Sequence, residues 1–201
     1  MTREEAKKIK EFIDAMIAEN APVRTAQVYL SELKPGEKFE FNGWTLTVLD
    51  KNERGVLCLT DQIVENRAFH KEDCEGCNNW AISTLREYLN GEFYEGLENE
   101  SAILEFERDL TSDDGLKDYG TCIDKVSLLT CDEYRKFRQF IDNKEDWWWT
   151  ITPYSTPYSG NSYYARTVDT DGSLGNNYAF YGDIGVSPAY CLDSSLIVKR
   201  A

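Results

Sequence analysis

The chain has 201 residues and a formal net charge of −14 at pH 7, with 41% apolar and 13% aromatic residues. This length suits one domain with a small appendage, and this apolar content argues for a folded core rather than disorder. The negative charge repels nucleic-acid phosphates and anionic lipid head groups, so neither is expected as a partner.

The first residues show no sign of a targeting or membrane segment. No apolar run approaches the roughly 20 residues that cross a bilayer, and the opening stretch MTREEAKKIKEF is charged where a signal peptide needs an apolar segment. We therefore expect a protein that is made in the cytoplasm and is not inserted into a membrane.

Residues 2–20 are expected to form an amphipathic helix outside the main domain. Thr2 and Glu5 have the spacing of a capping box. Apolar residues then recur at helical intervals, at Ile9, Phe12, Ile13, Met16 and Ile17. The helix packs on its own domain, or it docks on a partner or a second copy, and the sequence leaves both open. We assign residues 1–30 to this helix and its linker, and residues 31–201 to the domain.

An antiparallel meander is expected over residues 39–60. Phe39 and Phe41 alternate with charged residues, and Asn42-Gly43 is a strong signal for a two-residue hairpin turn. Further strands are expected over residues 44–49 and 56–60, with a second turn over 52–55.

The middle of the chain combines helices and a strand, and the last third lacks helix signals. We expect helices over residues 83–89, 100–108 and 132–141 and a strand over 123–129. After that, aromatic and β-branched residues alternate with turn dipeptides, which predicts short strands separated by long loops. The expected fold class is therefore α+β.

The six cysteines do not form a clear framework. Cys74 and Cys77 have metal-ligand spacing, and His70, Cys122 and Cys131 are conceivable partners for a zinc site. Free thiols in a loop, or a local disulfide formed on oxidation, explain the same pattern. We expect no metal.

The segment from Tyr154 to Asp183 has an unusual composition. Six tyrosines, four serines, four glycines and three asparagines fill 17 of its 30 positions, and no lysine or glutamate occurs from Asp146 to Val198. Antibody paratopes use this set, because tyrosine offers a large contact area at low entropic cost. An aromatic-rich sheet is the alternative, but the neighbours Tyr163 and Tyr164 would point to opposite faces of a strand. The composition favours a recognition surface.

Five short stretches, in a fixed order, resemble a known family. They are Asn79–Trp80, Ser83–Tyr94, Trp148–Pro153, Val168–Ser173 and Gly185–Ala189. Together they resemble the variable proteins of diversity-generating retroelements, a bacterial and phage group with a C-type-lectin-like fold. The resemblance runs from about Leu33 to Leu192 and leaves the N-terminal helix outside.

The resemblance implies an α+β, C-type-lectin-like (formylglycine-generating-enzyme-like) domain with short strands and long loops. It also implies a reverse transcriptase that rewrites codons at adenines, which turns asparagine codons into those of tyrosine, serine, aspartate and glycine but never of lysine or glutamate. A variable region of about residues 147–192 would sit on a fixed scaffold at Trp148, Trp149, Gly172, Gly185 and Pro188. The candidate ligand-binding residues are Tyr154, Thr156, Tyr158, Ser159, Asn161, Tyr163, Tyr164, Arg166, Asn176, Asn177, Tyr178, Phe180, Tyr181 and Asp183.

The chain departs from the family pattern at two positions. Ile151 and Ser187 stand where family members usually carry arginine, so any buried ion pair made by those arginines would be missing. Relatives with the same motifs also occur as invariant domains, so an invariant phage or bacterial interaction domain is the alternative. The final location, a phage particle included, stays open.

Catalytic and cofactor sites are not expected. Formylglycine-generating enzymes need a close cysteine pair late in the domain, whereas Cys191 is the only cysteine in the last third. His70 is the only histidine, so a nucleophilic triad has little support. The stretch Asp169–Gly172 begins like a calcium loop but lacks the closing glutamate. We expect a non-enzymatic protein that binds a protein or cell-surface ligand without a cofactor.

Overall fold

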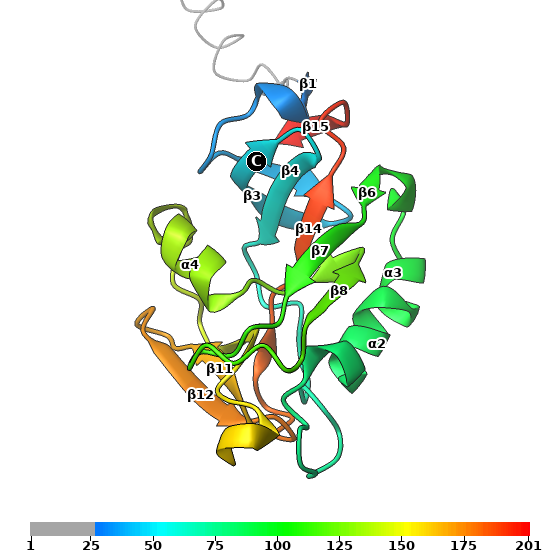
Figure 1. Ribbon diagram of the computed structural model, residues 1–201. Coiled ribbons are helices and arrows are strands. Elements are labelled where there is room, and N and C mark those ends of the chain that lie inside the picture. Colours follow the sequence, from blue (N-terminus) through cyan, green and yellow to red (C-terminus); the bar gives the residue numbers. More distant parts are fainter. Residues whose placement is uncertain (1–26) are drawn as a thin grey trace, which may run out of the picture.

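The computed structural model describes residues 27–201, so the helix expected over residues 2–20 lies outside the described residues. Figure 1 shows a mixed α+β domain in which short strands dominate, as the sequence predicted. The helices are α2 (Thr84–Asn90), α3 (Glu92–Glu95) and α4 (Cys131–Phe137), with 3-10 turns at Leu30–Glu32, Trp80–Ile82, Glu100–Ala102, Arg138–Phe140 and Pro157–Ser159. The described residues contain no helix with the length and hydrophobicity that a membrane-spanning segment needs.

The strands form two main sheets and a separate hairpin. One sheet has the order β1-β15-β2-β3-β4-β14-β6 with β9 also on β14, the second has the order β12-β11-β10-β13-β5, and β7 pairs with β8. The strand bounds are β1 (Gln27–Tyr29), β2 (Lys38–Phe41), β3 (Trp44–Asn52), β4 (Gly55–Thr60), β5 (Glu65–Asn66), β6 (Ile103–Leu104), β7 (Phe106–Asp109), β8 (Thr121–Asp124), β9 (Val126–Ser127), β10 (Trp148–Pro153), β11 (Tyr164–Val168), β12 (Leu174–Tyr178), β13 (Gly185–Val186), β14 (Ala189–Leu192) and β15 (Ile197–Arg200).

The first sheet joins the two ends of the described chain. Gln27 in β1 lies opposite Lys199 in β15, so the domain includes residues 27–30, which the sequence assigned to the linker. The expected meander is confirmed: Asn42 and Gly43 adopt φ of 50° and 80°, and this pair of left-handed residues turns β2 directly into β3.

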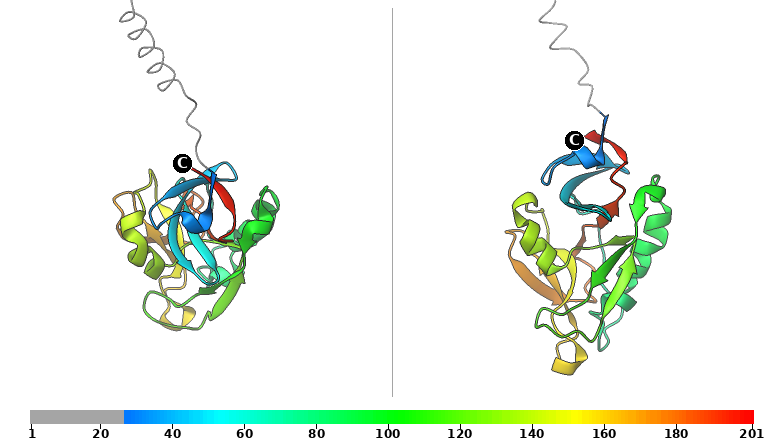
Figure 2. Two further views of the ribbon diagram at one scale, coloured as in Figure 1. Left: turned by 90° about the horizontal axis from the view of Figure 1, so that it is seen from above. Right: turned by 45° about the horizontal axis from the view of Figure 1, so that its top comes forward.

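The second sheet carries the tyrosine-rich segment. Its central strand β10 is buried throughout, whereas β12 forms one edge of the sheet. Figures 1 and 2 show β11 and β12 at the end of the molecule opposite β1 and β15. The tyrosine-rich segment is therefore far from Gln27, the first residue that the structure describes.

The helix expected over residues 100–108 is wrong. Only a 3-10 turn forms at its start, followed by strands β6 and β7. Arg108 is buried, while its neighbours Glu107 and Asp109 are exposed, so the side chains alternate between two faces as in a strand. Pairing of Ile103 and Leu104 with β14 overrides the helix propensity of the glutamates.

The other predicted elements are largely present. The helix over residues 83–89 corresponds to α2, whose first turn is capped by the Ser83 side chain. The strand over 123–129 is interrupted and becomes β8 and β9, and the helix over 132–141 changes to a 3-10 turn after Phe137.

Three aromatic side chains tie the second sheet to the rest of the core. The Phe69 ring lies 5.4 Å from that of Trp80 and 5.7 Å from that of Trp149. The indole N–H of Trp149 donates to the Arg67 carbonyl at 2.8 Å. These contacts hold β10, the strand next to the tyrosine-rich hairpin, in one position.

Ile151 and Ser187, which differ from the pattern of the resembled group, are both packed in the interior. Ile151 is completely buried in the main core, and the buried Ser187 hydroxyl donates to the Thr60 carbonyl at 2.8 Å. Lys144 donates to the same carbonyl at 2.9 Å, so a buried ammonium lies beside Ser187. Burial lowers the pKa of Lys144 to about 8.

Candidate ligand-binding face

Five aromatic rings form one continuous cluster on the second sheet. The Tyr164 ring lies 4.4 Å from Tyr178 and 6.2 Å from Tyr154, and the Tyr178 ring lies 5.1 Å from Phe180 and 5.3 Å from Tyr181. Tyr154 and Tyr181 are 38% and 43% exposed, so the cluster reaches solvent. We call this surface the tyrosine face, which comprises Tyr154, Tyr164, Arg166, Asn176, Tyr178, Phe180 and Tyr181.

The register of the β11–β12 hairpin brings these residues together. Tyr164 lies opposite Tyr178, and Arg166, two residues after Tyr164, lies opposite Asn176, two residues before Tyr178. Side chains two residues apart share one face of a strand, so these four side chains lie next to one another on the same face of the sheet. Asn177 belongs to the other face, where its cross-strand partner Ala165 is completely buried.

Helix α4 covers one end of the hairpin and leaves the tyrosine end open. The Tyr134 hydroxyl donates to the Gly172 carbonyl at 2.7 Å, and Val168 and Leu174 pack in the same small apolar cluster as Tyr134. Tyr164 and Tyr178, at the other end of the hairpin, are partly exposed. The rings are therefore held by the sheet but remain accessible.

The loop between β10 and β11 carries three more candidate residues. Tyr158 is 85% exposed, and Ser159 and Asn161 are exposed beside it. The loop is held at its base, where the Thr156 hydroxyl donates to Asp118 at 2.9 Å and the Ser155 hydroxyl donates to Asp114 at 2.6 Å.

Besides Asn177, two predicted site residues lie elsewhere than expected. Thr156 is completely buried, because its hydroxyl bonds to Asp118 beneath the loop, so it is not part of the exposed surface. Tyr163 is partly buried and packs against the main core. Asp183 is exposed and follows the ring cluster in the chain, two residues after Tyr181.

The loop of residues 111–119 contributes contacts that sequence reasoning missed. In addition to Asp114 and Asp118, it supplies Asp113, whose carboxylate lies 3.6 Å from Nε of Arg166 and 3.1 Å from a terminal nitrogen of Arg135. The available signal was the clustering of aspartates with Gly115, which indicates a turn but not the segment that it contacts.

Arg166 is held within the face and is not a free cation. Its guanidinium lies 5.7 Å from the Tyr154 ring centroid and donates a long hydrogen bond of 3.5 Å to Asn176. With Asp113 as its ionic partner, its side chain is only 13% exposed. A hydrogen bond with Tyr178 also raises the pKa of Tyr164 above the ordinary value of 10.

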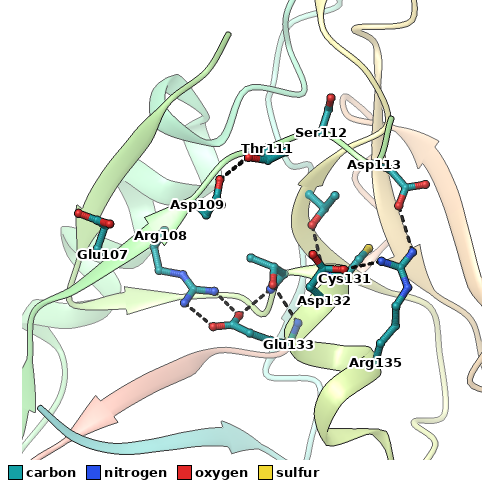
Figure 3. A pocket seen from close by; sticks show the side chains of 12 residues that line it. Glu107, Arg108, Asp109, Thr111, Ser112, Asp113, Cys131, Asp132, Glu133 and Arg135 are labelled. Carbon is teal, nitrogen blue, oxygen red and sulfur yellow. Dashed lines mark hydrogen bonds and ion pairs between the residues drawn. The ribbon is translucent and has the colours of Figure 1, made fainter. Parts of the chain in front are cut away.

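A polar cavity of about 300 Å³ adjoins the face beyond Asp113. Figure 3 shows the Arg108–Glu133 ion pair on one side of it and Asp109 and Asp113 on the other. The Arg108 side chain is 3% exposed and donates to the two Glu133 oxygens at 2.8 and 2.5 Å and to the Leu128 carbonyl at 2.9 Å.

Glu133 also caps α4. Its carboxylate accepts the Thr130 backbone N–H at 2.8 Å, while the Thr130 hydroxyl accepts the Glu133 N–H at 3.0 Å, so the two form a capping box. Burial alone would raise the pKa of Glu133, but the Arg108 charge and these hydrogen bonds outweigh it and lower the pKa below the usual 4.5.

The lowered pKa of Glu133 predicts an acid-dependent contribution to stability. Because the folded pKa lies below the unfolded value, the contribution is complete above about pH 4.5 and is lost as the pH falls through the folded pKa. We expect Glu133→Gln to lower the free energy of unfolding by about 1.5–3 kcal/mol at pH 7, because a charge-assisted bond is weakened. Urea titrations at pH 7 and pH 3 should show this difference shrinking in acid. An equal difference at both pH values would contradict the assignment.

The cysteine and histidine side chains that the sequence offered for a zinc site are not gathered into one cluster in the described residues. Within residues 27–201 no group of three or more histidine, cysteine, aspartate or glutamate side chains is arranged to hold a metal ion. All six cysteines are free thiols. His70 accepts the Thr84 backbone N–H through Nδ1 at 3.3 Å, next to the start of α2.

Comparison with known proteins identifies a family and no closer relative. No curated protein and no solved structure matches the chain significantly. The family described as "Domain of unknown function (DUF6273)" matches residues 54–194, which is more than half of the chain and includes the whole tyrosine face. The chain therefore belongs to the DUF6273 family.

Proposed function

We propose that this protein is a non-enzymatic binding protein with a C-type-lectin-like fold, whose tyrosine face recognises a protein or other cell-surface ligand. The observation that carries this proposal is the continuous cluster of five rings at the open end of the second sheet. The short strands joined by long irregular segments support the fold assignment.

The chemistry of the face fits recognition. Tyrosine buries a large amphipathic area while only two χ angles are fixed, and cross-strand packing already restrains these rings before a ligand arrives. Lysine and glutamate, which are depleted in interface cores, are absent from residues 146–198. The face therefore offers contact area and neutral hydrogen-bonding groups at low entropic cost.

We further propose that a retroelement diversifies the face. Most positions assigned to the scaffold are buried, whereas those assigned to ligand contact, except the buried Thr156, are partly or fully exposed, which supports this idea. Trp148 and Trp149 are 1% and 0% exposed, and Gly185 and Pro188 are also buried, whereas Tyr158 is 85% exposed. Substitutions at exposed positions usually change stability little, so this arrangement would tolerate many sequences.

Deep sequencing of the gene and its flanks in a source population tests diversification. We expect variation concentrated in codons 154–183, together with a nearby imperfect copy that differs at adenines. Codons for Trp148 and Trp149 serve as the internal control and should be invariant. Thr156 should vary less than Tyr158, because its side chain is buried against Asp118.

A uniform gene without such a copy would contradict diversification. The tyrosine face would then belong to an invariant interaction domain with one dedicated partner, since the same rings serve a fixed partner equally well.

A further inference from the structure

We propose that the ligand is a polypeptide that presents cationic side chains, above all arginine, to the tyrosine face. This inference rests on the function proposed above and names the chemistry of the partner. Three observations support it: the charge of the segments around the face, the position of Arg166, and the arrangement of the rings.

The segments that border the face are strongly acidic. Residues 71–77, 113–118 and 154–183 together contain nine aspartate or glutamate residues and only three lysine or arginine residues. Eight of the nine carboxylate residues are exposed. The first segment contacts the loop that precedes β11 through Gly76, whose N–H donates to the buried Ser162 hydroxyl at 3.0 Å. An approaching cationic chain is therefore attracted from several sides.

The face has little positive charge of its own to oppose such a chain. Arg166 is the only lysine or arginine between residues 146 and 198. Arg166 pairs with Asp113, which Arg135 of α4 also contacts, and the Arg166 side chain is mostly buried. Asp113, Asp114 and Asp118 are already engaged with Arg166, Ser155 and Thr156. The attraction therefore comes chiefly from the other exposed carboxylates of the bordering segments, such as Glu72, Glu75 and Asp183.

Arg166 also illustrates the contact that a partner would make. Its guanidinium lies over the Tyr154 ring, and elsewhere in the domain Arg67 lies 3.6 Å from the ring centroid of Tyr88. Tyrosine rings attract guanidinium groups placed above them. Tyr178 and Tyr181 belong to the same cluster, and Tyr181 is 43% exposed, so partner arginines have rings on which to repeat the arrangement.

Binding of short peptides to the full chain tests this inference. The probes are four peptides of equal length that alternate glycine and serine with arginine, lysine, glutamine or glutamate. We expect the order arginine, then lysine, then glutamine, with no binding of the glutamate peptide, and a marked loss of affinity for the arginine peptide at high salt.

Two variants separate stacking on the rings from general attraction to an acidic protein. Tyr178→Phe keeps an aromatic face and should bind the arginine peptide almost as well as the wild type. Tyr178→Leu should weaken that binding about tenfold, whereas Tyr29→Leu, at the opposite end of the domain, should not. Thermal unfolding checks each variant, and Tyr181→Leu replaces Tyr178→Leu if the latter does not fold.

Equal binding of the arginine and glutamine peptides would overturn the inference, as would undiminished binding of the arginine peptide to Tyr178→Leu and Tyr181→Leu. After either result, the proposed function would still be supported if a cell-surface ligand without cationic groups binds the wild type and loses affinity for the Tyr178 variant. If that ligand binds without any contribution from the tyrosine face, the proposed function fails as well.

Discussion

Replacing Asp124 by alanine is expected to lower the free energy of unfolding by about 3–5 kcal/mol. The Asp124 side chain is completely buried, accepts the indole N–H of Trp80 at 2.7 Å and accepts Nε of Arg86 at 2.6 Å. Alanine would leave the Trp80 N–H without a partner in the core and the Arg86 charge without its counter-ion. One carboxylate thus fixes α2 and the preceding 3-10 turn to β8.

Urea or thermal unfolding measures this effect. Asp132→Ala is the matched control, because Asp132 is 92% exposed and pairs only with Arg135 three residues along α4. The control should cost less than about 1 kcal/mol. Similar losses for the two variants would show that the buried network around Asp124 does not hold the domain together.

Replacing Tyr178 by alanine is expected to weaken ligand binding by about 2–4 kcal/mol, or roughly 30-fold to 1,000-fold. Tyr178 is the centre of the ring cluster, within 5.3 Å of Tyr164, Phe180 and Tyr181. Truncation therefore removes its own contact and also leaves its neighbours less well positioned. Because the side chain lies on an open face at a sheet edge, the loss of stability should be only about 1 kcal/mol.

Equilibrium binding and thermal unfolding, measured on the same preparations, distinguish these two effects. Tyr29→Ala is the control, since Tyr29 is 51% exposed but lies in β1 at the other end of the domain. Equal losses of stability and affinity in Tyr178→Ala would indicate that the rings are structural. Unchanged affinity would remove Tyr178 from the ligand site.

Local signals were sufficient for the hairpin of β2 and β3 and for α2, but not for β6 and β7. Asn42-Gly43 and Ser83 act through neighbouring backbone groups, so their effects can be read from a short stretch of sequence. Residues 100–108 form strands because Ile103 and Leu104 pair with β14, almost 90 residues later in the chain. Such pairing overrides local propensity and leaves little trace in the sequence.

The candidate site was also predictable only in part: the sequence identified the segment but not its tertiary contacts. The composition singled out the segment that includes Tyr164 and Tyr178, and the register of one hairpin places them together. Burial of Thr156 was not predictable, because it depends on Asp118 in a loop that is distant in sequence. The acidic loop around Asp113 became part of the site only through tertiary contacts.

The most direct test of the account is to map where a ligand binds. An array of cell-surface proteins and glycans, probed with the full chain, would supply the ligand, and hydrogen exchange with and without it would locate the contact. The account predicts protection at β11, β12 and the loop of residues 154–163, with β1 and β15 unchanged. Protection confined to β1 and β15, with the tyrosine face exchanging as in the free protein, would contradict it.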